Sequence, residues 1–354
     1  MSVLDDAGRI AVLDPSGMLQ TVESCADHWR EGVSRARAVD LSHIPDHSGL
    51  TGVVVCGMGG SGIAGDVAAA TAALSGAVPV VVTKGFTLPA HAGPNSLVFL
   101  VSYSGNTAET IACFEEAHAR GAQMIAVATG GQLAEMAHAH AFPCIVPAAG
   151  MQPRAAFPHL AAAVLVALER LGVLPDLTGE LVEIDEVLRE QTVRCSRNVV
   201  EAENPAKQIA AALYGGLPVV WGQDGHLAVA ATRWKMQLNE NAKVPAFAST
   251  LPELDHNEIV GLGPGAPDAA GLAIAALRAP NEDPRMARRA EAALNVARER
   301  GAKTVEAHVH GISGLAQLAS AVQLGDMASV YLALLRGVDP TPVEAIERLK
   351  AEVS

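Results

Sequence analysis

The sequence predicts an α/β protein made of two similar halves, each a parallel β-sheet flanked by helices. Short apolar runs alternate with helical stretches along most of the 354 residues, and this pattern is typical of a parallel sheet covered on both faces. A glycine cluster at residues 57–62 joins one apolar run directly to a helix. Aromatic residues make up only 3% of the chain, which favours close packing of small side chains between helices and sheet.

In the N-terminal half, a helix over residues 20–36 precedes the first strand. Strands are expected at 53–56, 78–83, 97–101, 124–128 and 144–146. Helices at 63–74, 108–120 and 132–139 fall between several of these strands. A long apolar helix over 155–171 closes this half, and residues 172–179, with Pro175, form its exit.

The C-terminal half repeats the scheme after an acidic helix over residues 180–200. Strands are expected at 217–221, 244–247, 271–276 and 304–307, and helices at 227–238, 285–299, 315–335 and from Val343 onward. We therefore predict two domains, 1–175 and 176–354, that share an architecture without a visible residue-level repeat.

Charge and composition exclude several classes of protein. The net charge of −13 argues against nucleic-acid binding, which needs clustered Lys and Arg. The apolar helix at 155–171 contains Pro158 and His159 and is short for a membrane span, and the N-terminus lacks a basic-then-apolar signal. The five cysteines lack CxxC spacing and are expected to be reduced and mostly buried. We expect a cytoplasmic protein without membrane partners.

Two histidine pairs are the only candidates for metal binding. His138 and His140 form one pair and His308 and His310 the other, and neither lies in an HExxH pattern or beside a cluster of acids. A weak adventitious site at His308 and His310 is the metal alternative. We expect no metal and no cofactor.

The glycine cluster GMGGSG, residues 57–62, predicts an anion site, because a strand that ends in glycines presents bare N–H groups beside a helix N-terminus. The same letters match the dinucleotide fingerprint GxGxxG, which requires an acid at the end of the next strand. Here that strand ends in Thr83-Lys84. A dinucleotide site and a purely structural turn remain as alternatives.

A second loop favours a sugar phosphate. Residues 102–107, SYSGNT, follow an apolar strand and precede a helix, so three hydroxyls and a helix N-terminus meet at one strand end. Such neutral donors can surround a phosphate monoester. Helix capping by Ser104 or Thr107 is the simpler interpretation, but it accounts for one hydroxyl and not for three.

Four further segments complete a pattern that is specific to one family. GMGGSG followed by SYSGNTAET resembles the sugar isomerase (SIS) domain. MQPRAAFP at 151–158, NENAKVPA at 239–246, ELDHNEIVG at 253–261 and DPTPVEAIERLK at 339–350 resemble the bifunctional phosphoglucose/phosphomannose isomerases. The resemblance implies two tandem SIS domains of flavodoxin-like, three-layer α/β/α form. It also implies a cofactor-free enzyme that interconverts glucose 6-phosphate, and mannose 6-phosphate as a second substrate, with fructose 6-phosphate.

The resemblance also implies the site residues. Those that would hold the substrate phosphate are Gly59, Gly60, Ser61, Ser102, Ser104 and Thr107. Arg154 would face carbons 1 and 2, and Glu240 would be the base. His256 and Lys350 would open the sugar ring, with His256 supplied by the partner subunit of a homodimer.

Aldose–ketose isomerisation requires the same types of group. Moving a carbonyl from C1 to C2 shifts one proton through a cis-enediolate, which a single carboxylate such as Glu240 can relay. A permanent cation such as Arg154 can stabilise the developing negative oxygen. A histidine that titrates near neutrality suits acid–base work at the ring oxygens.

Each catalytic residue could also have an ordinary structural role. Glu240 could be a surface acid at a helix end, and His256 could be a simple loop histidine. Arg154 could pair with an acid, and Lys350 could be solvated. At the level of function, the alternatives are a non-catalytic sugar-phosphate sensor, an isomerase of another phosphosugar such as an amino sugar or a heptulose, and a dinucleotide enzyme.

Overall fold

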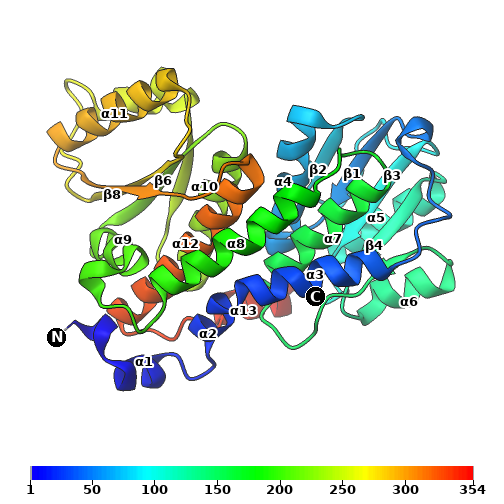
Figure 1. Cartoon of the computed structure of the whole chain (residues 1–354), viewed down its shortest axis with the longest axis horizontal. Coiled ribbons are helices and arrows are strands. Elements are labelled where there is room, and N and C mark those ends of the chain that lie inside the picture. The colour runs from blue at the N-terminus through cyan, green and yellow to red at the C-terminus, as the bar shows by residue number, and fades with distance from the viewer. Residues whose placement is uncertain (1, 354) are drawn as a thin grey trace. The chain divides into compact units, whose positions relative to one another are not determined.

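The computed structural model describes residues 2–353, and its contacts divide the chain into two compact units. The N-terminal unit comprises Ser24–Glu186 and Ser313–Ala316. The C-terminal unit comprises Met1–Glu23, Val187–Ile312 and Gln317–Ser354. Each unit is built on one parallel β-sheet (Figure 1). The predicted fold class, parallel sheets flanked by helices, is confirmed.

The N-terminal sheet has the strand order β2-β1-β3-β4-β5, with every neighbouring pair parallel. Its strands are β1 (Gly52–Cys56), β2 (Val80–Thr83), β3 (Ser96–Val101), β4 (Gln123–Val127) and β5 (Cys144–Ile145). All residues of β1 and β3 are buried. Burial on both faces is the reason that both strands read as unbroken apolar runs and not as alternating ones.

Helices cover both faces of this sheet. Side chains of β1, β3 and β4 form one apolar cluster with α5 (Ala108–Ala119) and α6 (Gly131–Ala139). On the opposite face α4 (Gly59–Ser75) approaches so closely at Gly65 that a Cβ there would lie 2.9 Å from Val55 Cγ1. Further helices, α3 (Cys25–Ala38) and α7 (Phe157–Arg170), pack against each other, and α7 also contacts α4.

The C-terminal sheet has the parallel order β7-β6-β8-β9. Its strands are β6 (Leu217–Gln223), β7 (Phe247–Leu251), β8 (Leu272–Arg278) and β9 (Lys303–His308). The helices are α9 (Pro205–Leu213), α10 (His226–Glu240), α11 (Pro284–Glu299), α12 (Gly314–Arg336) and α13 (Glu344–Val353). Helix α12 is long and apolar enough to cross a membrane, but 94% of its apolar stretch is buried inside the protein, as expected of a core helix.

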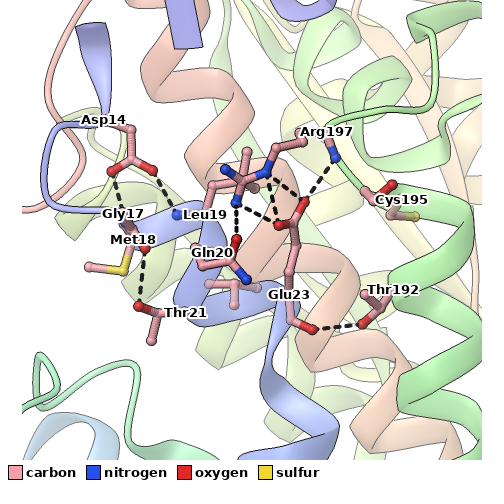
Figure 2. A network of polar contacts seen from close by, with 12 residues as sticks. Asp14, Gly17, Met18, Leu19, Gln20, Thr21, Glu23, Thr192, Cys195 and Arg197 are labelled. Atoms are coloured by element: carbon pink, nitrogen blue, oxygen red, sulfur yellow. Dashed lines mark hydrogen bonds and ion pairs between the residues drawn. The ribbon is translucent and has the colours of Figure 1, made fainter. Parts of the chain in front are cut away.

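The first residues of the chain belong to the C-terminal unit, through a polar network drawn in Figure 2. Asp14 accepts the backbone N–H groups of Met18 and Leu19 at 2.8 Å and so caps α2 (Met18–Glu23), which follows α1 (Ala7–Leu13). The guanidinium of Arg197 donates to Glu23 Oε2 from Nη2 at 2.5 Å and from Nε at 3.0 Å. This charge-assisted, two-donor contact joins residues 174 positions apart.

Several boundaries differ from the expected ones. Residues up to Glu23 belong to the C-terminal unit, although they were expected in the N-terminal domain. The N-terminal unit extends to Glu186, whereas the predicted boundary lay between residues 175 and 176. The predicted helix 20–36 is two helices, α2 and α3, that meet at Ser24. The strand predicted at 244–247 lies later, as β7, and the loop before it is fixed by a hydrogen bond from Ala246 N to Asn239 Oδ1. Helix α8 (Thr178–Cys195) ends earlier than predicted.

A buried histidine lies between α3 and α7 in the N-terminal unit. His159 is 1% exposed, and among residues 2–353 neither of its ring nitrogens has a hydrogen-bond partner. Its ring centroid is 5.6 Å from that of His28. Burial, reinforced by repulsion from His28, lowers the pKa of His159 to about 4.

This pKa predicts acid sensitivity of the N-terminal unit. The pKa of histidine in the unfolded chain is near 6.5. Between pH 6.5 and about 4, His159 is therefore protonated in the unfolded chain and neutral in the folded protein. The stabilisation is therefore complete above pH 6.5 and is lost as the pH falls, by about 3 kcal/mol at most. Denaturant unfolding should show a weaker pH dependence for His159→Leu than for wild type. The exposed-site control His91→Gln should keep the full dependence, and an unchanged profile in His159→Leu would contradict the assignment.

Candidate active site

The glycine cluster lies where β1 passes into α4, at the carboxyl edge of the N-terminal sheet. Gly57 lies so close to its neighbours that a Cβ there would meet Ser61 C at 2.9 Å and Val101 O at 3.0 Å. The N-cap residue of α4 is the apolar Met58, and Gly59, Gly60 and Ser61 form the first turn. The loop thus brings the helix N-terminus against the end of β3, with its positive dipole end at the sheet edge.

The hydroxyl-rich loop follows β3, the next strand of the same sheet. Ser102 is 1% exposed, and its Oγ lies 2.7 Å from Thr107 Oγ1 and accepts the N–H of Gly105 at 3.1 Å. Ser104 is exposed, and its hydroxyl accepts the N–H of Asn106 at 3.3 Å. Thr107 is the N-cap residue of α5, but within the described chain its side chain does not cap the helix. The capping interpretation of Thr107 is therefore wrong.

A third loop, after β4, supports the hydroxyl-rich one. Gly105 has φ +73°, and a Cβ there would lie 1.8 Å from Gly130 O, so only glycine fits at this crossing. Thr129 donates both its N–H and its hydroxyl to the carbonyl of Tyr103, at 3.0 and 2.7 Å. Three consecutive strand ends therefore fix the position of Ser102 and its neighbours.

Tyr103 links this loop to the segment that carries Arg154. Its hydroxyl donates to Ala148 O at 2.8 Å and accepts Met151 N at 3.0 Å, and burial raises the pKa of the phenol. Arg154, three residues beyond Met151, is 3% exposed. Sequence reasoning did not single out Tyr103; its position between two serines of the loop was the available signal.

Lys84 occupies the position where a dinucleotide site would need an acid. It follows β2, and its ammonium group pairs with Asp66 of α4 at 2.5 Å. Its Cε lies against Gly62, where a Cβ would meet it at 3.0 Å. A cation rather than a carboxylate thus stands at this strand end, which does not fit recognition of an adenosine ribose.

In the C-terminal unit, Glu240 is the last residue of α10, and α10 is fixed firmly to α12. Arg233 and Asp326, 1% and 8% exposed, form a buried ion pair at 2.7 Å. Trp234 Nε1 donates to Ala321 O at 2.6 Å. Beside Glu240, Asn241 Nδ2 donates to Ser329 Oγ at 2.9 Å. These contacts leave the end of α10 little freedom to move.

Glu240 lines a cavity of about 620 Å³ together with the chain that follows α12. The other lining residues are Asn239, Lys243, Val338, Asp339, Pro342, Val343, Glu344, Ala345 and Ile346. Lys350 is exposed on α13, about one helical turn beyond Ile346. The structure thus brings the segments of Glu240 and Lys350 together.

His256 is elsewhere in the C-terminal unit. It is the exposed last residue of the short helix η4 (Glu253–His256), and it is not among the described residues that line the cavity of Glu240. Its neighbour Asp255 pairs with Arg289 of α11 at 2.9 Å, and Leu254 is buried in the core beneath. The helix η4 is therefore anchored, with its histidine outward.

The histidine pairs give no sign of a metal site. Within residues 2–353 no group of three or more His, Cys, Asp or Glu side chains is arranged to hold a metal ion. The ring of His310 contacts the guanidinium of Arg194, and burial followed by this positive neighbour lowers its pKa. The positive charge of Arg194 beside this ring disfavours binding of a metal cation there.

The fold and the loops at its sheet edge define a protein of the SIS class. A family model described as the SIS domain matches residues 52–153, and one described as the bacterial phospho-glucose isomerase C-terminal SIS domain matches residues 202–353. Among solved structures, a glucose-6-phosphate isomerase-like protein from Thermus thermophilus superposes with a TM-score of 0.65 over 100% of both chains, at 22% identity. That likeness shows the fold alone.

Sequence relatives narrow the class to one family. The bifunctional phosphoglucose/phosphomannose isomerase of Caldicellulosiruptor bescii is 35% identical over 85% of this chain and 89% of its own length. The enzyme of the same description from Aquifex aeolicus is 36% identical over 85% and 90%. The chain belongs to the bifunctional phosphoglucose/phosphomannose isomerase family, as the sequence motifs predicted.

The buried ion pair behind Glu240 yields a stability prediction. Arg233→Met removes the guanidinium that pairs with the buried carboxylate of Asp326 and should destabilise the C-terminal unit by about 3 kcal/mol. The double variant Arg233→Met/Asp326→Leu should recover most of this loss, because it removes the buried carboxylate as well. Trp221 and Trp234, both buried in this unit, report unfolding by fluorescence. Arg348→Met, which breaks the exposed pair with Glu352, should cost less than about 1 kcal/mol; a similar cost for both single variants would refute the argument.

Proposed function

We propose that this protein interconverts glucose 6-phosphate, and also mannose 6-phosphate, with fructose 6-phosphate. Family membership over 85% of the chain supports the reaction class. The observation that carries the mechanism is the position of Glu240, on a helix end fixed by buried contacts and lining a cavity. Preorganisation of this kind is what a proton relay between two carbons requires.

The loops of the N-terminal unit are proposed to bind the phosphate group. The first turn of α4, with Gly59, Gly60 and Ser61, supplies fixed backbone donors. Ser102, Ser104 and Thr107 supply hydroxyls, and the hydroxyls of Ser102 and Thr107 converge to 2.7 Å. Hydroxyls that bond each other can rotate to donate to an anion without any backbone movement.

Isomerisation is proposed to proceed through a cis-enediolate. Glu240 takes the proton from C2 of the open-chain aldose phosphate and returns it to C1, while O2 loses its hydroxyl proton and O1 gains one, so that the carbonyl moves from C1 to C2. Arg154, buried and permanently charged, stabilises the negative oxygen that develops. Activity on both epimers requires Glu240 to accept a C2 proton from either configuration, which rotation about C2–C3 would permit.

Ring opening is proposed to use His256 and Lys350. The outward position of His256 on its anchored helix, away from the cavity of Glu240, favours its use in the site of a partner subunit. We therefore propose that a homodimer is the catalytic unit. A cytoplasmic location, where sugar phosphates are available, fits this role.

An isomerase or epimerase of another phosphosugar is the second candidate. A protein from Sulfolobus acidocaldarius described as D-glucosamine-6-phosphate 4-epimerase is 31% identical over 66% of this chain. An assay with amino-sugar phosphates separates the two. A non-catalytic sensor is less favoured, because this chain holds the proposed base, the cation and both ring-opening groups.

Glu240→Gln should lower the turnover of both hexose phosphates by at least about 10³-fold, the scale of an acid–base group. Binding of fructose 6-phosphate should change little, because the amide keeps the shape of the carboxylate. A coupled assay with EDTA in every reaction measures turnover, and calorimetry measures binding. Turnover within tenfold of wild type would remove Glu240 from the role of base. An inactive wild-type protein that still binds fructose 6-phosphate would favour the sensor.

The shared site can be tested by complementation. Mixing inactive Glu240→Gln with inactive His256→Ala should restore part of the activity, because a hybrid dimer contains one site with both residues intact. Subunit exchange is verified with a mass-tagged chain. Exchange without recovered activity would argue against His256 acting across an interface.

A further inference from the structure

We propose that Lys243 is a positioning residue that joins the end of α10, which carries Glu240, to the C-terminal segment, which carries Lys350. The proposal rests on the function proposed above for the site. The ammonium group of Lys243 donates to the carbonyl of Glu240 at 2.5 Å and to the carbonyl of Pro340 at 3.1 Å. Lys243 thus connects the end of α10 to Pro340, which lies 97 positions beyond Lys243 in the sequence.

The backbone conformation of Lys243 is a second, independent observation that supports a functional role. Its φ is +55°, in the left-handed region, where only Ala141 accompanies it among the described non-glycine residues. A chain that reverses direction after a helix usually places glycine in this conformation, because a Cβ is disfavoured there. A lysine in this conformation lowers the stability of the fold locally. Such a residue is kept only where its side chain or its surroundings require it.

The side chain of Lys243 lies at the cavity of the proposed base, where its charge and reach have a use. Lys243, Glu240 and Asp339 line the same cavity of about 620 Å³. A cation at the C-terminal end of α10 also complements the negative pole of the helix, where carbonyl groups lack intrahelical partners. Glycine would make the turn more easily but could not reach Pro340.

The consequence concerns two proposed catalytic residues: Glu240, which lines the cavity, and Lys350, which follows the lining segment on α13. Glu240 is fixed from behind by the contacts of α10 with α12, whereas residues 344–352 of α13 are exposed along their length. Lys243 ties the end of α10 to the chain just before that exposed segment. Losing this tie should therefore misplace Lys350 relative to Glu240 while leaving the C-terminal unit folded.

The test compares four proteins in the isomerase assay. Lys243→Gly removes the tie and also relieves the backbone cost, so it should keep or raise the melting temperature. Its kcat should fall by about 10- to 100-fold, the scale of a displacement of about 1 Å, with a much smaller change in KM. Lys243→Met keeps the backbone cost and should lose both activity and some stability. Lys243→Arg, which can still donate to two carbonyls, should recover much of the kcat.

Ala141→Gly is the matched control, because it relieves the same left-handed conformation in an exposed turn of the N-terminal unit. It should raise stability slightly and leave kcat unchanged. Hydrogen exchange supplies a readout that does not depend on activity: amides at 338–346 should exchange faster in Lys243→Gly, and those of α10 should not.

Two results would overturn the proposal: a kcat of Lys243→Gly within about twofold of wild type, or unchanged exchange at 338–346. A wild-type protein without isomerase activity would instead refute the proposed function. The exchange data would then still decide whether Lys243 ties the two segments.

Discussion

The buried ion pair between Arg233 and Asp326 is the interaction on which the position of the C-terminal end of α10 depends. A guanidinium that is 1% exposed is tolerated only with a charged partner and well-oriented hydrogen bonds. This requirement fixes both the rotation of α10 and its height along α12, and Trp234 adds a second constraint on the same face. Because Glu240 lies two helical turns further along α10, these contacts also fix where Glu240 lies. The proposed base is therefore placed by contacts that have no part in the chemistry.

The phosphate site proposed in the N-terminal unit would work by a different principle. Its donors are neutral hydroxyls and backbone N–H groups at the ends of buried strands, and Lys84 is already paired with Asp66. Neutral donors in a fixed frame need no counter-charge of their own, and they lose little on desolvation compared with a lysine or arginine. In a chain of net charge −13, the proposed site would recognise a small anion by local geometry and not by the overall field.

Sequence periodicity predicted the fold well because the strands are buried on both faces and their apolar runs are continuous, as in β1 and β3. Local patterns also placed the loops 57–62 and 102–107 at the ends of buried strands, as found. Their binding of a phosphate stays a prediction, made because clustered glycines and hydroxyls at such a strand end are typical of an anion site. Local patterns did not predict that Glu23 would pair with Arg197, because nothing near either residue specifies a partner so distant in the chain. Strand β7 begins later than predicted for a related reason. Its residues, FASTL, are mostly half-buried and carry no continuous apolar run, and a hydrogen bond from Ala246 N to Asn239 Oδ1 holds the more apolar residues before it in a loop.

The segment 240–243 breaks two local rules within four residues. An acid at the C-terminus of a helix opposes the macrodipole, at a cost of about 0.3–1 kcal/mol, and a lysine in a left-handed conformation adds a further cost. Neither choice helps α10 to form, since Asn241 and the contacts with α12 already end and anchor it. Natural sequences are locally consistent except where function demands otherwise. Two such inconsistencies within one helical turn, both lining one cavity, are not explained by the folding of α10, and they support the catalytic role proposed for this helix end.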